Sequence, residues 1–180
     1  WYFGAEKGAI SPEAKRGFEV FLTEGRCVSC HTVEQDHALF TDSKFHNIGV
    51  GFTKIGKDVD KMAVTYLQAA QKGESVDIKV LTNQNVSELG RFAVTRKISD
   101  LGAFKTSTLR NIAKTAPYMH DGSLESLEDV VDFYNNGGKV EEEDPEVPFL
   151  SGGIRPLDLS DEQKADLEAF LKTLTSPNYQ

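Results

Sequence analysis

Two cysteines and a histidine lie within five residues of one another near the start of the chain. Cys27 and Cys30, the only cysteines, are separated by two residues, and His31 follows directly. Two thiols at this spacing can add to the two vinyl groups of one haem, and the next residue can then bring an imidazole nitrogen to the iron. The segment predicts a covalently attached c-type haem, held by both cysteines, with His31 as the proximal iron ligand.

Two other chemistries use paired cysteines. A thioredoxin-like dithiol is expected in a βαβ context, which the sequence lacks, and a zinc site needs four ligands and usually a second paired cluster. The remaining histidines, His37, His46 and His120, form no such cluster. Two cysteines in one place also exclude a disulfide scaffold. Because covalent haem attachment takes place outside the cytoplasm, we expect a periplasmic protein.

Length, net charge and hydrophobicity exclude several classes of protein. A chain of 180 residues is long enough for one domain with a core, so we expect a single domain over residues 1–180. The net charge of −8 argues against a nucleic-acid surface, and no apolar run is long enough to span a bilayer. The chain opens with Trp1-Tyr2-Phe3-Gly4, without an initiator Met or a signal peptide, as a mature or excised form would.

Helix signals lie at both ends of the chain and leave a loop-rich middle. We expect loops with at most short strands or turns between Glu74 and Lys114, and a solvated surface loop from Glu141 to Pro148. Four apolar stripes at helical spacing predict helices that begin at Ser11-Pro12, run from about Val59 to Lys72, run from Ser126 to Gly137, and run from Ser160 to a point before Pro177. The expected fold is an all-α, cytochrome c-like helical domain wrapped around one covalently bound c-type haem, with long loops.

Several motifs resemble one known family. Phe104-Lys-Thr-Ser-Thr-Leu-Arg-Asn111 and Thr115-Ala-Pro-Tyr-Met-His-Asp-Gly-Ser123 resemble the C-terminal haem domain of bacterial di-haem cytochrome c peroxidases. The likeness continues, in order, through Phe45-His46-Asn47, Leu89-Gly90-Arg91 and Leu127–Tyr134, and so covers nearly the whole chain. The resemblance implies a cytochrome c-like helical fold. It also implies that the first haem domain, where members of the family bind peroxide, is absent from this chain.

The resemblance also indicates a sixth iron ligand. Ordinary members of the family have a Met where this sequence has Tyr134, and a Tyr there is similar to the MauG-type branch, in which this haem has His and Tyr ligands. A phenolate is a hard anionic ligand that stabilises ferric iron. Tyr134 could instead be a core aromatic with a hydrogen-bonded hydroxyl, because it shares a helical stripe with Leu127 and Val131. Met119 is the second candidate, whereas Met62 is expected in the core of its helix.

Further site residues are implied less directly. The resemblance suggests that the backbone carbonyls of Thr115 and Pro117 help to bind calcium at a boundary between two haem domains. Arg110 and Arg91 could pair with haem propionates, since a guanidinium binds carboxylates bidentately, although exposed arginines are common. His120 could orient the haem pocket or a domain interface, or be structural.

These features lead to three functional hypotheses. The first is the electron-transfer haem domain of a di-haem peroxidase-like enzyme, possibly of the MauG type, which passes or stores electrons for peroxide reduction at a second haem. Its partners would be a second haem domain or subunit and a redox protein donor such as a small cytochrome or cupredoxin, and this chain would hold no catalytic residue. The second is a stand-alone mono-haem electron carrier. The third is a mono-haem enzyme, which needs Tyr134 and Met119 both off the iron.

Overall fold

The protein is mainly helical, with a single short sheet among the residues described. The computed structural model describes residues 2, 6–140 and 147–179. It divides into two compact units. The terminal unit comprises Trp1–Lys44, Thr106–Gly137 and Arg155–Gln180, and the middle unit comprises Phe45–Lys105 and Gly138–Ile154. The prediction of a helical fold class is confirmed, and the expectation of one domain over residues 1–180 stays a prediction.

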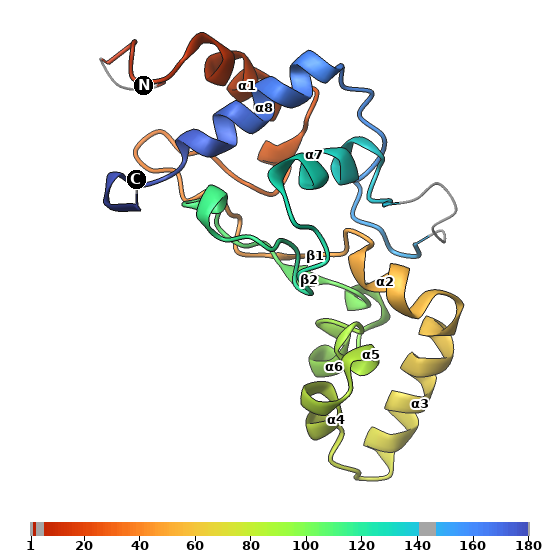
Figure 1. Ribbon diagram of the computed structural model, residues 1–180. Coiled ribbons are helices and arrows are strands. Elements are labelled where there is room, and N and C mark those ends of the chain that lie inside the picture. Colours follow the sequence, from red (N-terminus) through yellow and green to blue (C-terminus); the bar gives the residue numbers. More distant parts are fainter. Residues whose placement is uncertain (1, 3–5, 141–146, 180) are drawn as a thin grey trace. The chain divides into compact units, whose positions relative to one another are not determined.

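The terminal unit is built on the first and last long helices (Figure 1). Its helices are α1 (Pro12–Leu22), α7 (Leu127–Asn135) and α8 (Asp161–Thr173), with the short 3-10 turns Cys27–Ser29, Ile112–Lys114 and Pro177–Tyr179. The Ser11 side chain accepts a hydrogen bond from Ala14 N, which caps α1. Reciprocal capping boxes begin α7 at Ser126 and α8 at Ser160. The polar residues that predicted these helix starts therefore cap them.

A glycine lets α1 and α8 lie side by side. A Cβ atom at Gly17 would lie 1.8 Å from the carbonyl oxygen of Asp166, so no other residue fits without a shift. Next to this contact, Arg16 Nε donates to Asp166 Oδ2 at 2.6 Å and Nη2 donates to Oδ1 at 2.8 Å. Aromatic rings from both helices and from one loop fill the core around the crossing: Phe18, Phe21, Phe40 and Phe170.

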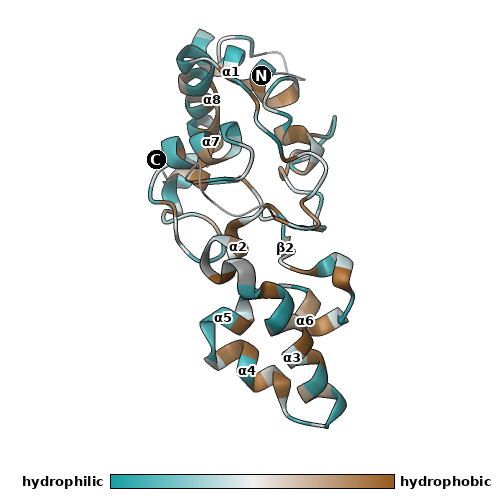
Figure 2. Ribbon diagram, turned by 90° about the vertical axis from the view of Figure 1, so that its right-hand side faces the viewer, coloured by the Kyte–Doolittle hydropathy of each residue, from teal (hydrophilic) through white to brown (hydrophobic). Residues whose placement is uncertain are grey.

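The middle unit is a small helical cluster with a two-stranded antiparallel sheet. Strand β1 (Phe45–His46) pairs with β2 (Phe104–Lys105). Its helices are α2 (Val50–Ile55), α3 (Val59–Gln71), α4 (Val76–Thr82), α5 (Gln84–Ser87) and α6 (Phe92–Thr95), with 3-10 turns at Gly56–Asp58 and Ile98–Asp100. Hydrophobic and hydrophilic residues alternate along α3 (Figure 2), as in a helix with one face in a core. Met62 packs against this core, as predicted.

The helices predicted at four places are confirmed, and one prediction is wrong. The stretch from Glu74 to Lys114 was expected to hold loops with at most short strands or turns, yet it contains α4, α5 and α6. These helices have four to seven residues, too few for an apolar period to show in the sequence. They form because each of them packs an apolar side chain into or against the core of the middle unit: Val76 from α4, Val86 from α5, and Phe92 and Ala93 from α6. Most of the loop from Glu141 to Pro148 lies outside the described residues.

Candidate haem site

The cysteines lie on a tight turn that follows α1. Gly25 N donates to Val20 O at 2.8 Å and ends the helix, and Arg26 has a left-handed backbone with φ of 56°. The 3-10 turn Cys27–Ser29 comes next, and the amides of Cys30 and His31 both donate to Cys27 O, at 3.2 and 2.9 Å. Residues three apart in such a turn lie on the same side of it. The turn therefore presents both thiols together, as attachment to one haem requires.

The thiols are poorly suited to redox or zinc chemistry. Cys27 Sγ donates to Gly25 O at 3.3 Å, and burial raises the pKa of its thiol to about 12. Burial also raises the pKa of Cys30. A reactive dithiol needs lowered pKa values, whereas an uncharged thioether is not penalised by burial. Within the described part of the chain, neither cysteine belongs to a group of three side chains that could hold a metal.

The imidazole of His31 is held in the tautomer that a metal ligand needs. His31 Nδ1 lies 2.7 Å from the carbonyl oxygen of Phe40. Because a carbonyl can only accept a hydrogen bond, Nδ1 carries the proton and the lone pair belongs to Nε2. Histidine ligands commonly donate their other ring nitrogen to a backbone carbonyl, which fixes the ring and raises its basicity. The residues present therefore fit a haem iron bound at Nε2.

The hydroxyl of Tyr134 is buried within electrostatic reach of the same thiols. Tyr134 is near the end of α7, and its ring contacts that of Phe133 edge to face at 5.3 Å. Its pKa is raised first by burial of the hydroxyl and then by the charges that Cys27 and Cys30 would carry. Helix α7 thus places a tyrosine within electrostatic reach of cysteines more than a hundred residues earlier in the chain. A bound metal cation would reverse this effect and favour the phenolate.

Three further predicted residues, Thr115, Pro117 and Met119, lie in one loop of the terminal unit. Met119 is half-buried in a loop and has a left-handed backbone with φ of 69°. Thr115 and Pro117 are exposed in the same loop, on either side of Ala116, and the Ala116–Pro117 peptide bond is cis. Their carbonyls are open to a cation that other groups would have to complete.

The two predicted propionate partners differ in their surroundings. Arg91 belongs to the middle unit, where its Nε lies 3.3 Å from Asp100 Oδ2 and its guanidinium lies 4.3 Å from the centre of the Phe45 ring. Arg110 belongs to the terminal unit, which also holds His31, and its guanidinium lies 5.2 Å from the centre of the Phe40 ring. His120 is exposed in the loop that carries Met119.

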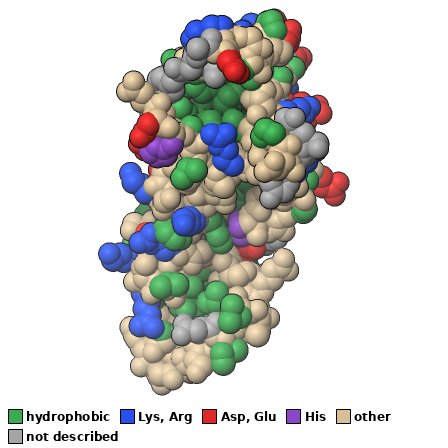
Figure 3. Space-filling view, turned by 90° about the vertical axis from the view of Figure 1, so that its left-hand side faces the viewer, with side chains coloured by type: hydrophobic (Ala, Val, Ile, Leu, Met, Phe, Trp, Pro, Cys, Tyr) green, Lys and Arg blue, Asp and Glu red, His purple; other side chains and the backbone are tan. Residues whose placement is uncertain are grey.

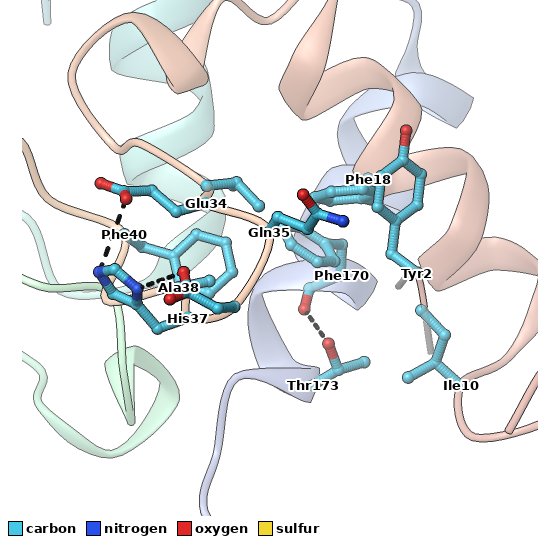
Figure 4. A pocket seen from close by; sticks show the side chains of 12 residues that line it. Tyr2, Ile10, Phe18, Glu34, Gln35, His37, Ala38, Phe40, Phe170 and Thr173 are labelled. Carbon is cyan, nitrogen blue, oxygen red and sulfur yellow. Dashed lines mark hydrogen bonds and ion pairs between the residues drawn. The ribbon is translucent and has the colours of Figure 1, made fainter. Parts of the chain in front are cut away.

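Two cavities of the terminal unit lie apart from the cysteines and Tyr134. One of about 300 Å³ has an aromatic floor that includes Phe18, Phe40 and Phe170 (Figure 4). Figure 3 shows hydrophobic side chains in a recess with acidic and histidine side chains beside it. The other, of about 410 Å³, is lined from Thr32 to Lys44. Neither includes a cysteine or Tyr134 in its wall.

Sequence reasoning missed the residues that hold His31 in place. The carbonyl of Phe40 acts through the backbone, which no side-chain pattern reveals. The Thr108 hydroxyl donates to the carbonyl of Leu39, the residue before Phe40. The sequence placed Thr108 in a family motif but gave it no role. The signal available for Thr108 was its place two residues before Arg110 in that motif.

A Cys-x-x-Cys-His turn after the first of two helices that cross at a glycine defines a cytochrome c-like helical domain. No family model matches the chain. It is 34% identical over 174 residues to the methylamine utilization protein MauG of Methylorubrum extorquens, covering 97% of this chain and 37% of that protein. It is 31% identical over 176 residues to the cytochrome-c peroxidase IdrP1 of Denitromonas iodatirespirans, covering 97% of this chain and 43% of that protein.

One solved structure that is similar to this chain also comes from a MauG-like protein. The crystal structure of a MauG-like protein associated with microbial copper homeostasis matches 99% of this chain and 51% of its own, with a TM-score of 0.65 and 28% identity. The chain therefore belongs to the bacterial di-haem cytochrome c peroxidase and MauG-type family, whose members are oxidoreductases with c-type haems. It spans about two fifths of the length of the two curated relatives named above. In the described residues, no helix is long and apolar enough to cross a membrane.

Proposed function

We propose that this chain is the electron-transfer haem domain of a di-haem, MauG-type enzyme. One haem c is attached to Cys27 and Cys30, with His31 as proximal ligand and Tyr134 as distal ligand. The observation that carries the proposal is the burial of the Tyr134 hydroxyl within electrostatic reach of both thiols, in the same unit as His31. When bound, the haem supplies reversible one-electron chemistry, and here it passes or stores electrons for a second haem held by another domain or subunit.

The protein side chains decide how this haem behaves. His31 offers a lone pair whose direction is set by the hydrogen bond to Phe40 O. Tyr134 would hold the iron as its second protein ligand and would then lose its phenolic proton, because a metal cation lowers the pKa of its ligands. Two protein ligands keep peroxide from this iron. A hard phenolate also stabilises the ferric state, which gives this domain a low reduction potential.

The complete enzyme would work in the periplasm. Its reaction would be the reduction of hydrogen peroxide to two waters, with two electrons supplied through a small cytochrome or cupredoxin and two protons taken from solvent. The alternative reaction would be the oxidation of a protein substrate in the MauG-type manner. Backbone carbonyls of Thr115 and Pro117 would contribute to a calcium site that a second haem domain completes.

Spectra of the ferric protein test the ligand set. Electron paramagnetic resonance and near-infrared spectra are recorded for the full-length protein and for Tyr134→Phe, Met119→Leu and the control Tyr66→Phe, a buried tyrosine of the middle unit. We expect only Tyr134→Phe to change the iron signal of this haem, and the wild type to lack a Met-to-iron charge-transfer band. A Met band that Met119→Leu removes would show that Met119 is the ligand.

Haem stoichiometry and turnover test the enzymatic role. The pyridine haemochrome of the natural full-length protein counts its haems, and Cys27→Ser/Cys30→Ser should lose one of them. Peroxide turnover by the full-length protein is expected to need both haems. A single haem per chain, six-coordinate and without peroxide turnover, would establish the alternative, a stand-alone mono-haem electron carrier.

A further inference from the structure

Four successive backbone carbonyls next to the haem-binding turn accept hydrogen bonds from side chains. These carbonyls belong to residues 38–41, which we name the carbonyl strap. Two of the donors come from the haem-binding turn and the residue after it, and the other two come from a segment about seventy residues later. The pairs are Arg110 Nε to Ala38 O at 2.8 Å, Thr108 Oγ1 to Leu39 O, His31 Nδ1 to Phe40 O at 2.7 Å and Thr32 Oγ1 to Thr41 O at 2.9 Å.

The strap has a conformation that needs support. Phe40 has a left-handed backbone with φ of 54°, which is unfavourable for a residue with a Cβ atom. Its buried ring packs against Phe21 and Phe170, while the guanidinium of Arg110 lies over the same ring. Contacts on the ring and on the backbone together hold Phe40 O where His31 Nδ1 reaches it.

The two donors from the later segment are themselves connected. Arg110 N donates to Thr108 Oγ1 at 3.1 Å, and the same hydroxyl donates to Leu39 O. Arg110 Nε then binds the carbonyl one residue earlier. Thr108 and Arg110 therefore donate hydrogen bonds to two neighbouring carbonyls of the strap, directly before the carbonyl that accepts from His31.

We propose that Thr108 and Arg110 are positioning residues for the proximal ligand. By fixing the strap, they set the strength of the hydrogen bond from His31 Nδ1 to Phe40 O. That bond raises the basicity of Nε2, and a more basic imidazole stabilises ferric iron. The inference rests on the proposed function only in requiring a haem iron at His31.

The sign of the potential shift separates this role from simple pairing of Arg110 with a haem propionate. Loss of a cation near the iron favours the ferric state and lowers the reduction potential. Loosening of the strap weakens the Nδ1 hydrogen bond and raises the potential. Thr108 carries no charge, so a substitution there acts through the strap alone.

The test uses the haem-loaded full-length protein. The redox signal of this haem is identified as the one that Cys27→Ser/Cys30→Ser removes. Thr108→Val and Arg110→Lys should each shift the ferrous-to-ferric ratio at fixed solution potential about threefold toward ferrous iron, which is a rise of about 30 mV for a one-electron couple. They should also speed solvent exchange of the His31 Nδ1 proton in the paramagnetic NMR spectrum.

Matched variants complete the design. Thr108→Ser keeps the hydroxyl and should restore both readouts. Thr82→Val in the middle unit, which removes a similar hydrogen bond from a threonine hydroxyl to the backbone carbonyl of Ile78, should change neither. Unchanged potentials and proton exchange in both Thr108→Val and Arg110→Lys would overturn the positioning role. A fall in potential in Arg110→Gln, without any shift in Thr108→Val, would overturn it in favour of a charge effect.

Haem content distinguishes failure of the proposed function from failure of this inference alone. If the wild-type protein carries no haem at Cys27 and Cys30, both the proposed function and this inference fail. If the haem is present and the potentials do not respond, only the inference fails. Should Thr108→Val fail to fold, Arg110→Lys still decides the question, since it keeps the charge and loses the Nε donor.

Discussion

Replacement of Gly17 by alanine tests the helix crossing that builds the terminal unit. In an ordinary exposed helix, Gly→Ala stabilises by about 1 kcal/mol, because alanine restricts the unfolded chain and favours the helix. At Gly17 the added Cβ atom would lie 1.8 Å from the carbonyl oxygen of Asp166. Ordinary contact begins at 3.4 Å, so the two helices would have to separate by about 1.6 Å. Backbone atoms cannot rotate away as a flexible side chain can.

The magnitude follows from these two opposing effects. Overpacking of a core costs about 3 kcal/mol at its upper end, and the gain in helix propensity offsets about 1, which leaves a loss of about 2 kcal/mol. For a chain of this size each kcal/mol changes Tm by about 2–4 °C, so Gly17→Ala should lower Tm by about 4–8 °C. The separation would also stretch the paired hydrogen bonds between Arg16 and Asp166.

Differential scanning calorimetry of the haem-loaded protein measures this loss. Gly8→Ala is the matched control, since a Cβ there meets nothing within 4 Å, and it should leave Tm within about 2 °C of the wild type. A rise in Tm for Gly17→Ala would refute the close crossing of α1 and α8, because it would mean that helix propensity alone acts at this position.

Three further predictions address other parts of the fold. Tyr66→Phe removes the donor to Ala93 O at 2.7 Å and should cost about 1–2 kcal/mol in urea unfolding without changing the iron spectrum; an unchanged midpoint would exclude that bond as a stabilising contact. Hydrogen bonds from Ser126 lower the pKa of Asp129, so its stabilisation is present above the unfolded pKa of about 4 and disappears as the pH falls through the lower folded value. Asp129→Asn should flatten the loss of Tm below about pH 4, and an identical acid profile would contradict this. Ser160→Ala removes the cap of α8 and should lower the stability by about 1 kcal/mol, whereas Ser160→Asp should retain it; equal losses in both would contradict capping.

Features carried by neighbouring residues were predictable from the sequence. The long helices were found from their caps and apolar stripes, because both signals depend on residues within about four positions of each other. Cys27, Cys30 and His31 were found in the same way, from the spacing that haem attachment requires. The short helices α4 to α6 were missed because packing in the middle unit, rather than a local period, stabilises them.

The amino-acid sequence by itself determined the haem-binding motif, the main helices and the resemblance to one family. Only the tertiary structure buried the Tyr134 hydroxyl within electrostatic reach of the two thiols and packed Gly17 against the backbone of Asp166. It also joined Thr108 and Arg110 to the carbonyl strap beside His31. These contacts join residues about seventy to one hundred and fifty positions apart, and three of them act through backbone carbonyls, whose directions depend on the folded path of the chain rather than on residue type.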